Sequence, residues 1–192
     1  MTARLLSLLA CAGLALGSPF PVEAQQASSA KNNAQAELMD LFSEFCLTKF
    51  PDDGAAAQYA NLKGFRPMPE QKLRALLGDD PGAGWLNETA FGTYEVTIKQ
   101  PPSHTCTVSN RLERAGSVKD AFGTTLSLWV GTRHMGSLGV FPPTEQDVSG
   151  RKAELYRWAL TRTDGSKESF TALVTPAGAE SDIRLDRVMP DQ

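Results

Sequence analysis

Two cysteines lie in segments of different hydrophobic period, and this contrast constrains the fold more than any other feature of the chain. Cys46 belongs to an apolar stripe that recurs at three- and four-residue steps, which predicts a helix over residues 34–49 with Cys46 on its buried face. Cys106 alternates with His104 and Val108, which predicts a strand whose Cys106 and Val108 face the core. A bond between the two cysteines would therefore fasten a helix to one face of a sheet.

The first 24 residues predict export. Arg4 precedes an apolar run over residues 5–16, and helix-breaking Gly and Pro follow. Val22 and Ala24 then place an aliphatic and a small residue at the two positions that signal peptidase reads, so we expect cleavage before Gln25. The run is shorter than the roughly 20 residues needed to cross a bilayer, which disfavours an uncleaved anchor. Lipidation at Cys11 is a second alternative, with a short apolar segment before it. The expected location is periplasmic or secreted.

Export leaves Cys46 and Cys106 as an even pair in an oxidising compartment, because Cys11 departs with the signal. We therefore predict a disulfide between them. Closing a loop of about 60 residues would contribute on the order of 4 kcal/mol in the chain-entropy model. The alternative is a thiol pair with metal or redox work, to which His104 could add a ligand. No further ligand stands at a recognisable spacing and there is no Cys-x-x-Cys motif, so no metal and no cofactor are expected.

The remaining chain divides into a flexible leader over residues 25–33, which lacks an apolar period, and a single domain over residues 34–190. The whole chain has 19 basic and 22 acidic residues; removing Arg4 and Glu23 leaves 18 and 21, the same net charge of -3. Basic and acidic residues are interspersed without a basic stripe, which argues against a nucleic-acid partner. No second apolar segment reaches membrane-spanning length, so we expect no stable membrane insertion after cleavage.

The change of period along the domain predicts an α+β fold. Helices are expected over residues 34–49, from Pro51 to Gly64, and from Pro69 to Gly78. Two strands, a fourth helix and three more strands should follow, at residues 93–99, 104–108, 117–129, 155–161, 168–175 and 182–189. Residues 79–84 and Gly131 to Gly150 are predicted to be loops. The ββαβββ order suggests a five-stranded, mainly antiparallel sheet with helices on one face, a PAS-like or profilin-like order.

The helix cysteine, the strand cysteine and the residues around them resemble a group of small exported bacterial proteins of uncharacterised function. The resemblance covers residues 39–129 and includes Leu41, Phe42, Phe45, Cys46, Pro51, Gly64, Phe65 and Cys106. It implies a periplasmic location. It supplies no catalytic residue.

Candidate catalytic groups are few. Gly136-Ser137-Leu138-Gly139 is similar to a nucleophile elbow, although Met135 stands where the first glycine belongs. A pair of serine and histidine could come from Ser103, Ser137, His104 and His134. Asp79 and Asp80 before Pro81 are typical of a turn rather than a calcium site. The three tryptophans, Trp85, Trp129 and Trp158, are interpreted as core residues, and Asn87 heads a formal glycosylation acceptor.

These observations favour a non-enzymatic envelope protein that binds a partner protein or small ligand through the loop from Gly131 to Gly150, a length typical of recognition loops. The alternative is a small periplasmic hydrolase that uses a Ser/His pair. The two differ in one respect: a hydrolase requires serine, histidine and carboxylate to converge in one cleft.

Overall fold

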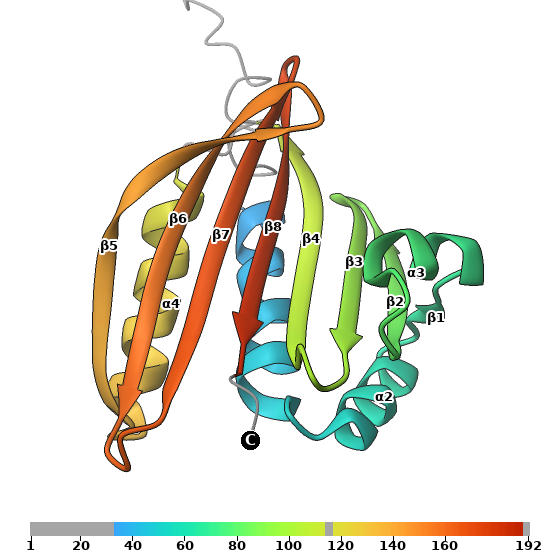
Figure 1. Ribbon diagram of the computed structural model, residues 1–192. Coiled ribbons are helices and arrows are strands. Elements are labelled where there is room, and N and C mark those ends of the chain that lie inside the picture. The colour runs from blue at the N-terminus through green and yellow to red at the C-terminus, as the bar shows by residue number, and fades with distance from the viewer. Residues whose placement is uncertain (1–32, 114–116, 190–192) are drawn as a thin grey trace, which may run out of the picture.

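A single antiparallel sheet of eight strands organises the chain, in the order β1-β2-β3-β4-β8-β7-β6-β5 (Figure 1). The computed structural model describes residues 33–113 and 117–189. The predicted signal peptide and all but the last residue of the predicted leader lie outside this range. The strands are β1 (Arg66–Pro67), β2 (Gly82–Thr89), β3 (Gly92–Lys99), β4 (Thr105–Glu113), β5 (Gly136–Val148), β6 (Arg151–Arg162), β7 (Lys167–Ala177) and β8 (Glu180–Val188).

The helices match their predicted positions closely. Residues 33–42 form an α-helix that continues into the π-helix η1 (Ser43–Lys49). Then come α2 (Asp53–Leu62), α3 (Glu70–Leu77) and α4 (Val118–Thr132). The Asp52 side chain caps α2 by accepting a hydrogen bond from the Ala55 amide at 2.9 Å. Gly64 ends that segment at a φ of 74°, and Phe65 folds back into the core, as predicted.

The core lies on the face of the sheet that carries helix 33–42, its continuation η1, and α4. We call this the inner face (Figure 1). Alternation along the strands sends Tyr94, Val96 and Ile98 inward, and each is at most 1% exposed. Phe122 of α4 contacts Phe42 and Trp158 edge to face, with ring centroids 4.8 and 5.2 Å apart. The interpretation of the three tryptophans as core residues is confirmed, since none is more than 9% exposed.

The predicted disulfide is present. Cys46 and Cys106 are bonded, their Cα atoms are 5.4 Å apart, and neither residue is exposed. The bond joins η1 to β4 across the inner face, where the two periodicities placed it. A disulfide is typical of proteins in oxidising, extracytoplasmic compartments.

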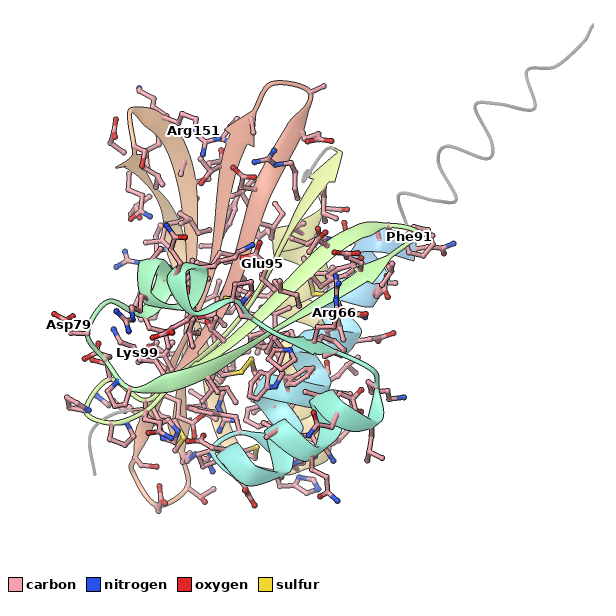
Figure 2. All side chains as sticks on the ribbon, turned by 90° about the vertical axis from the view of Figure 1, so that its right-hand side faces the viewer. Arg66, Asp79, Phe91, Glu95, Lys99 and Arg151 are labelled. Atoms are coloured by element: carbon pink, nitrogen blue, oxygen red, sulfur yellow. A yellow bond between two sulfur atoms is a disulfide. The ribbon has the colours of Figure 1, made fainter. Side chains whose placement is uncertain are left out.

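The predicted five-stranded sheet is wrong in number, and the ββαβββ order is not found. Residues 82–84, predicted to be loop, begin β2, and most of the predicted loop from Gly131 to Gly150 is the long strand β5. The expectation of helices on one face only is also wrong, because α3 packs on the opposite, outer face (Figure 2). Gly82 and Gly84 make this possible: a Cβ at Gly82 would lie 2.7 Å from a Leu77 methyl carbon, and one at Gly84 2.8 Å from a Leu73 methyl carbon.

Candidate functional site

The outer face of the sheet carries rows of polar side chains instead of a second core. One row crosses four strands, because Thr97 pairs with Thr107, Thr107 with Asp186, and Asp186 with Thr171. Asp186 is only 8% exposed, and its carboxylate accepts three hydrogen bonds. The donors are Thr107 Oγ1 at 2.6 Å, Thr171 Oγ1 at 3.0 Å and Arg184 Nε at 2.9 Å. Three donors leave this carboxylate little capacity for further bonds, so its role here is to hold its neighbours in place.

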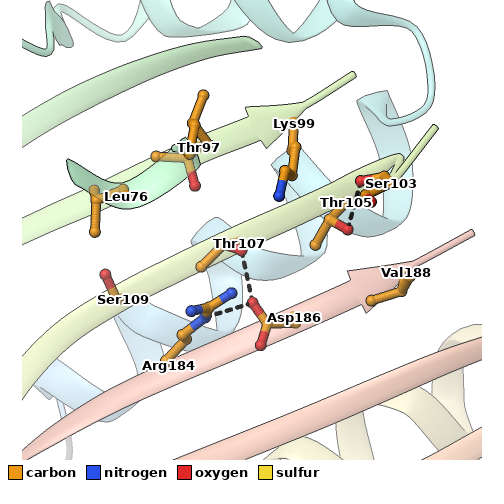
Figure 3. A pocket seen from close by; sticks show the side chains of 11 residues that line it. Leu76, Thr97, Lys99, Ser103, Thr105, Thr107, Ser109, Arg184, Asp186 and Val188 are labelled. Carbon is orange, nitrogen blue, oxygen red and sulfur yellow. Dashed lines mark hydrogen bonds and ion pairs between the residues drawn. The ribbon is translucent and has the colours of Figure 1, made fainter. Parts of the chain in front are cut away.

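A hollow of about 200 Å³ lies between the end of α3 and this row, and we call it the lower hollow (Figure 3). Leu76 and Leu77 of α3 form its apolar side, and Lys99 and Arg184 supply cations. Lys99 forms an ion pair with Asp80, which lies in the turn predicted for residues 79–81. The other polar lining consists of the Asp186 carboxylate and of hydroxyl groups, from Thr97, Ser103, Thr105, Thr107 and Ser109.

A larger hollow of about 540 Å³, the upper hollow, continues from it, since Ser109 and Arg184 line both. The hairpin of β5 and β6 bends over this part of the sheet and contributes Val148 and Arg151 (Figure 1). Leu173 of β7 adds a further apolar side chain.

One carboxylate holds two arginines at this hollow. Asp182 accepts a hydrogen bond from Arg111 Nε at 2.7 Å and two from the Arg151 guanidinium at 3.1 Å each. The hydrogen bond from Arg111 is the main cause of the lowered pKa of Asp182, with a smaller contribution from Arg151 and opposition from burial. The same bond raises the pKa of the Arg111 guanidinium. Arg151 also donates to the Pro176 carbonyl.

Three arginines line the upper hollow, and each is paired with a carboxylate: Arg111 and Arg151 with Asp182, and Arg184 with Asp186. The carboxylates in the lining of this hollow are those of Asp182 and Glu95. Glu95 already forms an ion pair with Lys72 of α3 at 2.6 Å. Among the described residues, Arg111 and Arg184 donate to carboxylates through Nε only, and their side chains are 59% and 53% exposed, so their Nη groups can donate to a ligand.

Neither hollow brings a serine and a histidine candidate together. Ser103 lines the lower hollow, whereas the next residue, His104, packs against Phe50 with ring centroids 4.3 Å apart. His104 Nε2 lies 3.4 Å from Asp53 Oδ1. His134 lies in the turn after α4 with a φ of 50°, and Ser137 lies on β5. The elbow-like run from Gly136 to Gly139 is part of that strand, without the strand-to-helix turn that the motif requires.

Within residues 33–113 and 117–189, no group of three or more His, Cys, Asp and Glu side chains is arranged to hold a metal ion. In the same ranges no helix is long and apolar enough to cross a bilayer.

Sequence reasoning missed the arginines and aspartates of the outer face. A signal for them exists, since Thr107, Ser109 and Arg111 alternate with the core residues of β4, and Asp182, Arg184 and Asp186 occupy every second position of β8. What the pattern lacks is the neighbour relationship of β4 and β8, which are about 75 residues apart in the chain.

Comparison with known proteins adds little to this site. No family model matches the chain, and no curated protein matches it significantly. A solved structure of a protein of unknown function from Pseudomonas aeruginosa, PA94, suggested to be a regulator, matches 66% of this chain and 83% of its own. The identity is 11% and the TM-score is 0.29, values that transfer neither fold nor function. The fold and site therefore define the protein on their own terms: an α+β domain with a disulfide and a polar, partly cationic sheet face.

Proposed function

We propose that this protein is a non-enzymatic, exported binding domain that takes a ligand carrying acidic groups on the outer face of its sheet. The observation that carries the proposal is the pair of guanidinium groups that the single Asp182 carboxylate holds beside a hollow of about 540 Å³. Guanidinium groups are suited to carboxylates and phosphates because they donate two parallel hydrogen bonds.

The remaining lining fits a binding role better than a catalytic one. Asp182 and Asp186 are engaged by arginine and threonine donors, and no histidine lines either hollow. Hydroxyl groups and the side chains of Leu173 and Val148 supply the polar and apolar contacts that fix a ligand's orientation. The sequence analysis expected residues 131–150 to form the binding segment. The binding face proposed here is built from several strands, and of residues 131–150 only Val148, at the end of β5, lines it.

The ligand site is tested by titrating citrate and, separately, a hexaglutamate peptide into isotope-labelled protein and following backbone amide shifts. We expect shifts around Arg111, Arg151, Arg184 and Ser109, and weaker binding as salt concentration rises. The double variant R111Q/R184Q should weaken binding at least about fivefold, because each charged hydrogen bond at an exposed site contributes on the order of 1 kcal/mol. Arg66→Gln, which removes an arginine with 64% side-chain exposure outside the hollows, is the matched control. Shifts spread evenly over the surface, or equal weakening by Arg66→Gln, would contradict the proposal.

The location is tested separately. We propose that residues 1–24 are a cleaved export signal and that the protein works in the periplasm or outside the cell, where the bond between Cys46 and Cys106 can form. Mass spectrometry of the exported material should find Gln25, free or cyclised, at the N-terminus. Intact Met1 or a lipid on Cys11 would refute the cleavage that we propose.

A further inference from the structure

β5 forms one of the two edges of the sheet, opposite β1, and its first half lacks the usual protection of an edge (Figure 1). Residues 136–143 carry no charge, whereas exposed edges are commonly guarded by lysine, inward-pointing charge or proline. Pro142 and Pro143 guard only the end of this segment, at the irregularity between Phe141 and Thr144. The strand therefore presents a short, neutral edge.

The backbone groups that face outward can be assigned from the pairing with β6. The Thr163 amide donates to the Met135 carbonyl at 3.1 Å, and the register continues from Gly136 opposite Arg162 to Phe141 opposite Arg157. In an antiparallel ladder every second residue bonds the same neighbour. Ser137, Gly139 and Phe141 therefore bond β6, and Leu138 and Val140 direct their N–H and C=O groups away from the sheet.

The side chains at this edge are apolar on both faces. Val140 is 65% exposed and Phe141 is 49% exposed, which are high values for residues of these types within a strand. Gly139 lies between Leu138 and Val140 and has no side chain that could obstruct an approaching strand. Such an edge can accept another strand through backbone hydrogen bonds.

We propose that the occupant of this edge is a second copy of the same chain, paired antiparallel about a two-fold axis at Gly139. In that register Leu138 of one copy lies opposite Val140 of the other, and both residues are among those with outward backbone groups. The two Gly139 residues face each other as a non-hydrogen-bonded pair. A two-fold contact requires a self-complementary surface. Because residues 136–143 carry no charge, two copies paired about this axis meet without like-charge repulsion. The result is a continuous antiparallel sheet through both copies.

The first test is the solution mass. Sedimentation equilibrium of the purified protein should give a monomer–dimer equilibrium, and Val140→Lys should raise the dissociation constant at least about tenfold, since the change acts twice in a two-fold contact. Leu62→Lys is the matched control, because it places the same charge at another exposed apolar residue, 77% exposed and on α2. It should leave the dissociation constant unchanged.

The second test reads the register by cross-linking. A Cβ at Gly139 meets only the Ala159 carbonyl oxygen, at 3.7 Å, so Gly139→Cys should be accommodated. Opposed cysteines in a non-hydrogen-bonded pair lie within disulfide range, and mild oxidation should yield covalent dimer. Phe141→Cys is the control: on the same face, it would be displaced from its copy by four residues, about 13 Å along the strands. The native cysteines are already bonded and unexposed.

A wild-type protein that remains monomeric at several hundred micromolar would overturn this inference. A dimer that Val140→Lys leaves unchanged would place the interface elsewhere and overturn it as well. Equal cross-linking of the Gly139→Cys and Phe141→Cys variants would reject the register, and with it the two-fold axis at Gly139. None of these outcomes depends on ligand binding at the outer face.

Discussion

Replacing Glu168 with Gln is expected to lower the free energy of unfolding by about 3 to 5 kcal/mol, because it leaves a buried guanidinium without its counter-charge. Arg187 is 2% exposed and Glu168 is 3% exposed. They meet on the inner face, where Arg187 Nε donates to Glu168 Oε2 at 2.8 Å. Burial is the main cause of the lowered pKa of Arg187, and the Glu168 carboxylate opposes that effect.

Arg187 also contributes to the end of the first helix. Its Nη1 donates to the Cys46 carbonyl at 2.6 Å and to the Phe50 carbonyl at 3.3 Å, and its guanidinium lies 5.1 Å from the centre of the Trp129 ring. Cys46 lies in the last turn of η1 and Phe50 directly follows it, so Arg187 supplies donors at a helix end whose carbonyls have no partner within the helix. The side chain therefore joins β8, η1 and α4, which explains why a charged residue occupies a core position.

Urea denaturation followed by circular dichroism measures this effect, and a double-mutant cycle separates its parts. The double variant E168M/R187M should be less destabilised than the sum of the two single variants, since it leaves no fully buried charge unpaired; the second partner of Glu168, Arg162, keeps 28% side-chain exposure. The exposed pair Glu70 and Arg74, each with 75% side-chain exposure, provides the control: Glu70→Gln should change stability by no more than about 0.5 kcal/mol. If the losses of stability in the Glu168 and Arg187 single variants simply added up in the double variant, the two residues would not stabilise the protein through their mutual interaction.

Reduction of the disulfide is expected to lower the free energy of unfolding by about 2 to 5 kcal/mol. The bond closes a loop of 60 residues, and its loss releases chain entropy in the unfolded state. Cys46→Ala should therefore lower the melting temperature of the oxidised protein and leave the protein in reductant comparatively little changed.

Thermal unfolding with and without dithiothreitol checks this result. The wild type should respond to the reductant, and the Cys46→Ala variant should not. Thiol titration of denatured wild type should find no free thiol from Cys46 and Cys106. A wild-type melting temperature that is the same in both conditions would contradict a stabilising role for the bond.

The elements that sequence reasoning found are those in which a local pattern coincides with burial. The stripe through Cys46, the alternation of Tyr94, Val96 and Ile98, and the α4 stripe through Phe122 each mark one face that the core covers. The disulfide was predicted from the even pair of cysteines that export leaves, and two such patterns agreed with it. In each case the signal is contained within one turn or a few residues of strand.

The elements that it missed have their cause elsewhere in the chain. Gly82 and Gly84 are typical of a loop, yet they pair with Lys99 and Thr97 of β3, and their lack of a side chain leaves room for α3 above the strand. In β5 the irregularity after Phe141 and the exposure of the edge remove the alternation that would have marked a strand. Neither cause can be read from the segment itself.

By itself the sequence determined which residues face the core in the first helix, in α4 and in the strands β3 and β4, and it predicted the covalent link between Cys46 and Cys106. The tertiary structure alone decided which strands are neighbours, and so brought Arg111 of β4 and Arg151 of β6 to the same carboxylate of β8. The reason is physical: a two-residue period assigns a side chain to a face of a sheet and carries no information about strand order. The arginine pair at Asp182 and the exposed strand edge at Gly139 both result from that strand order.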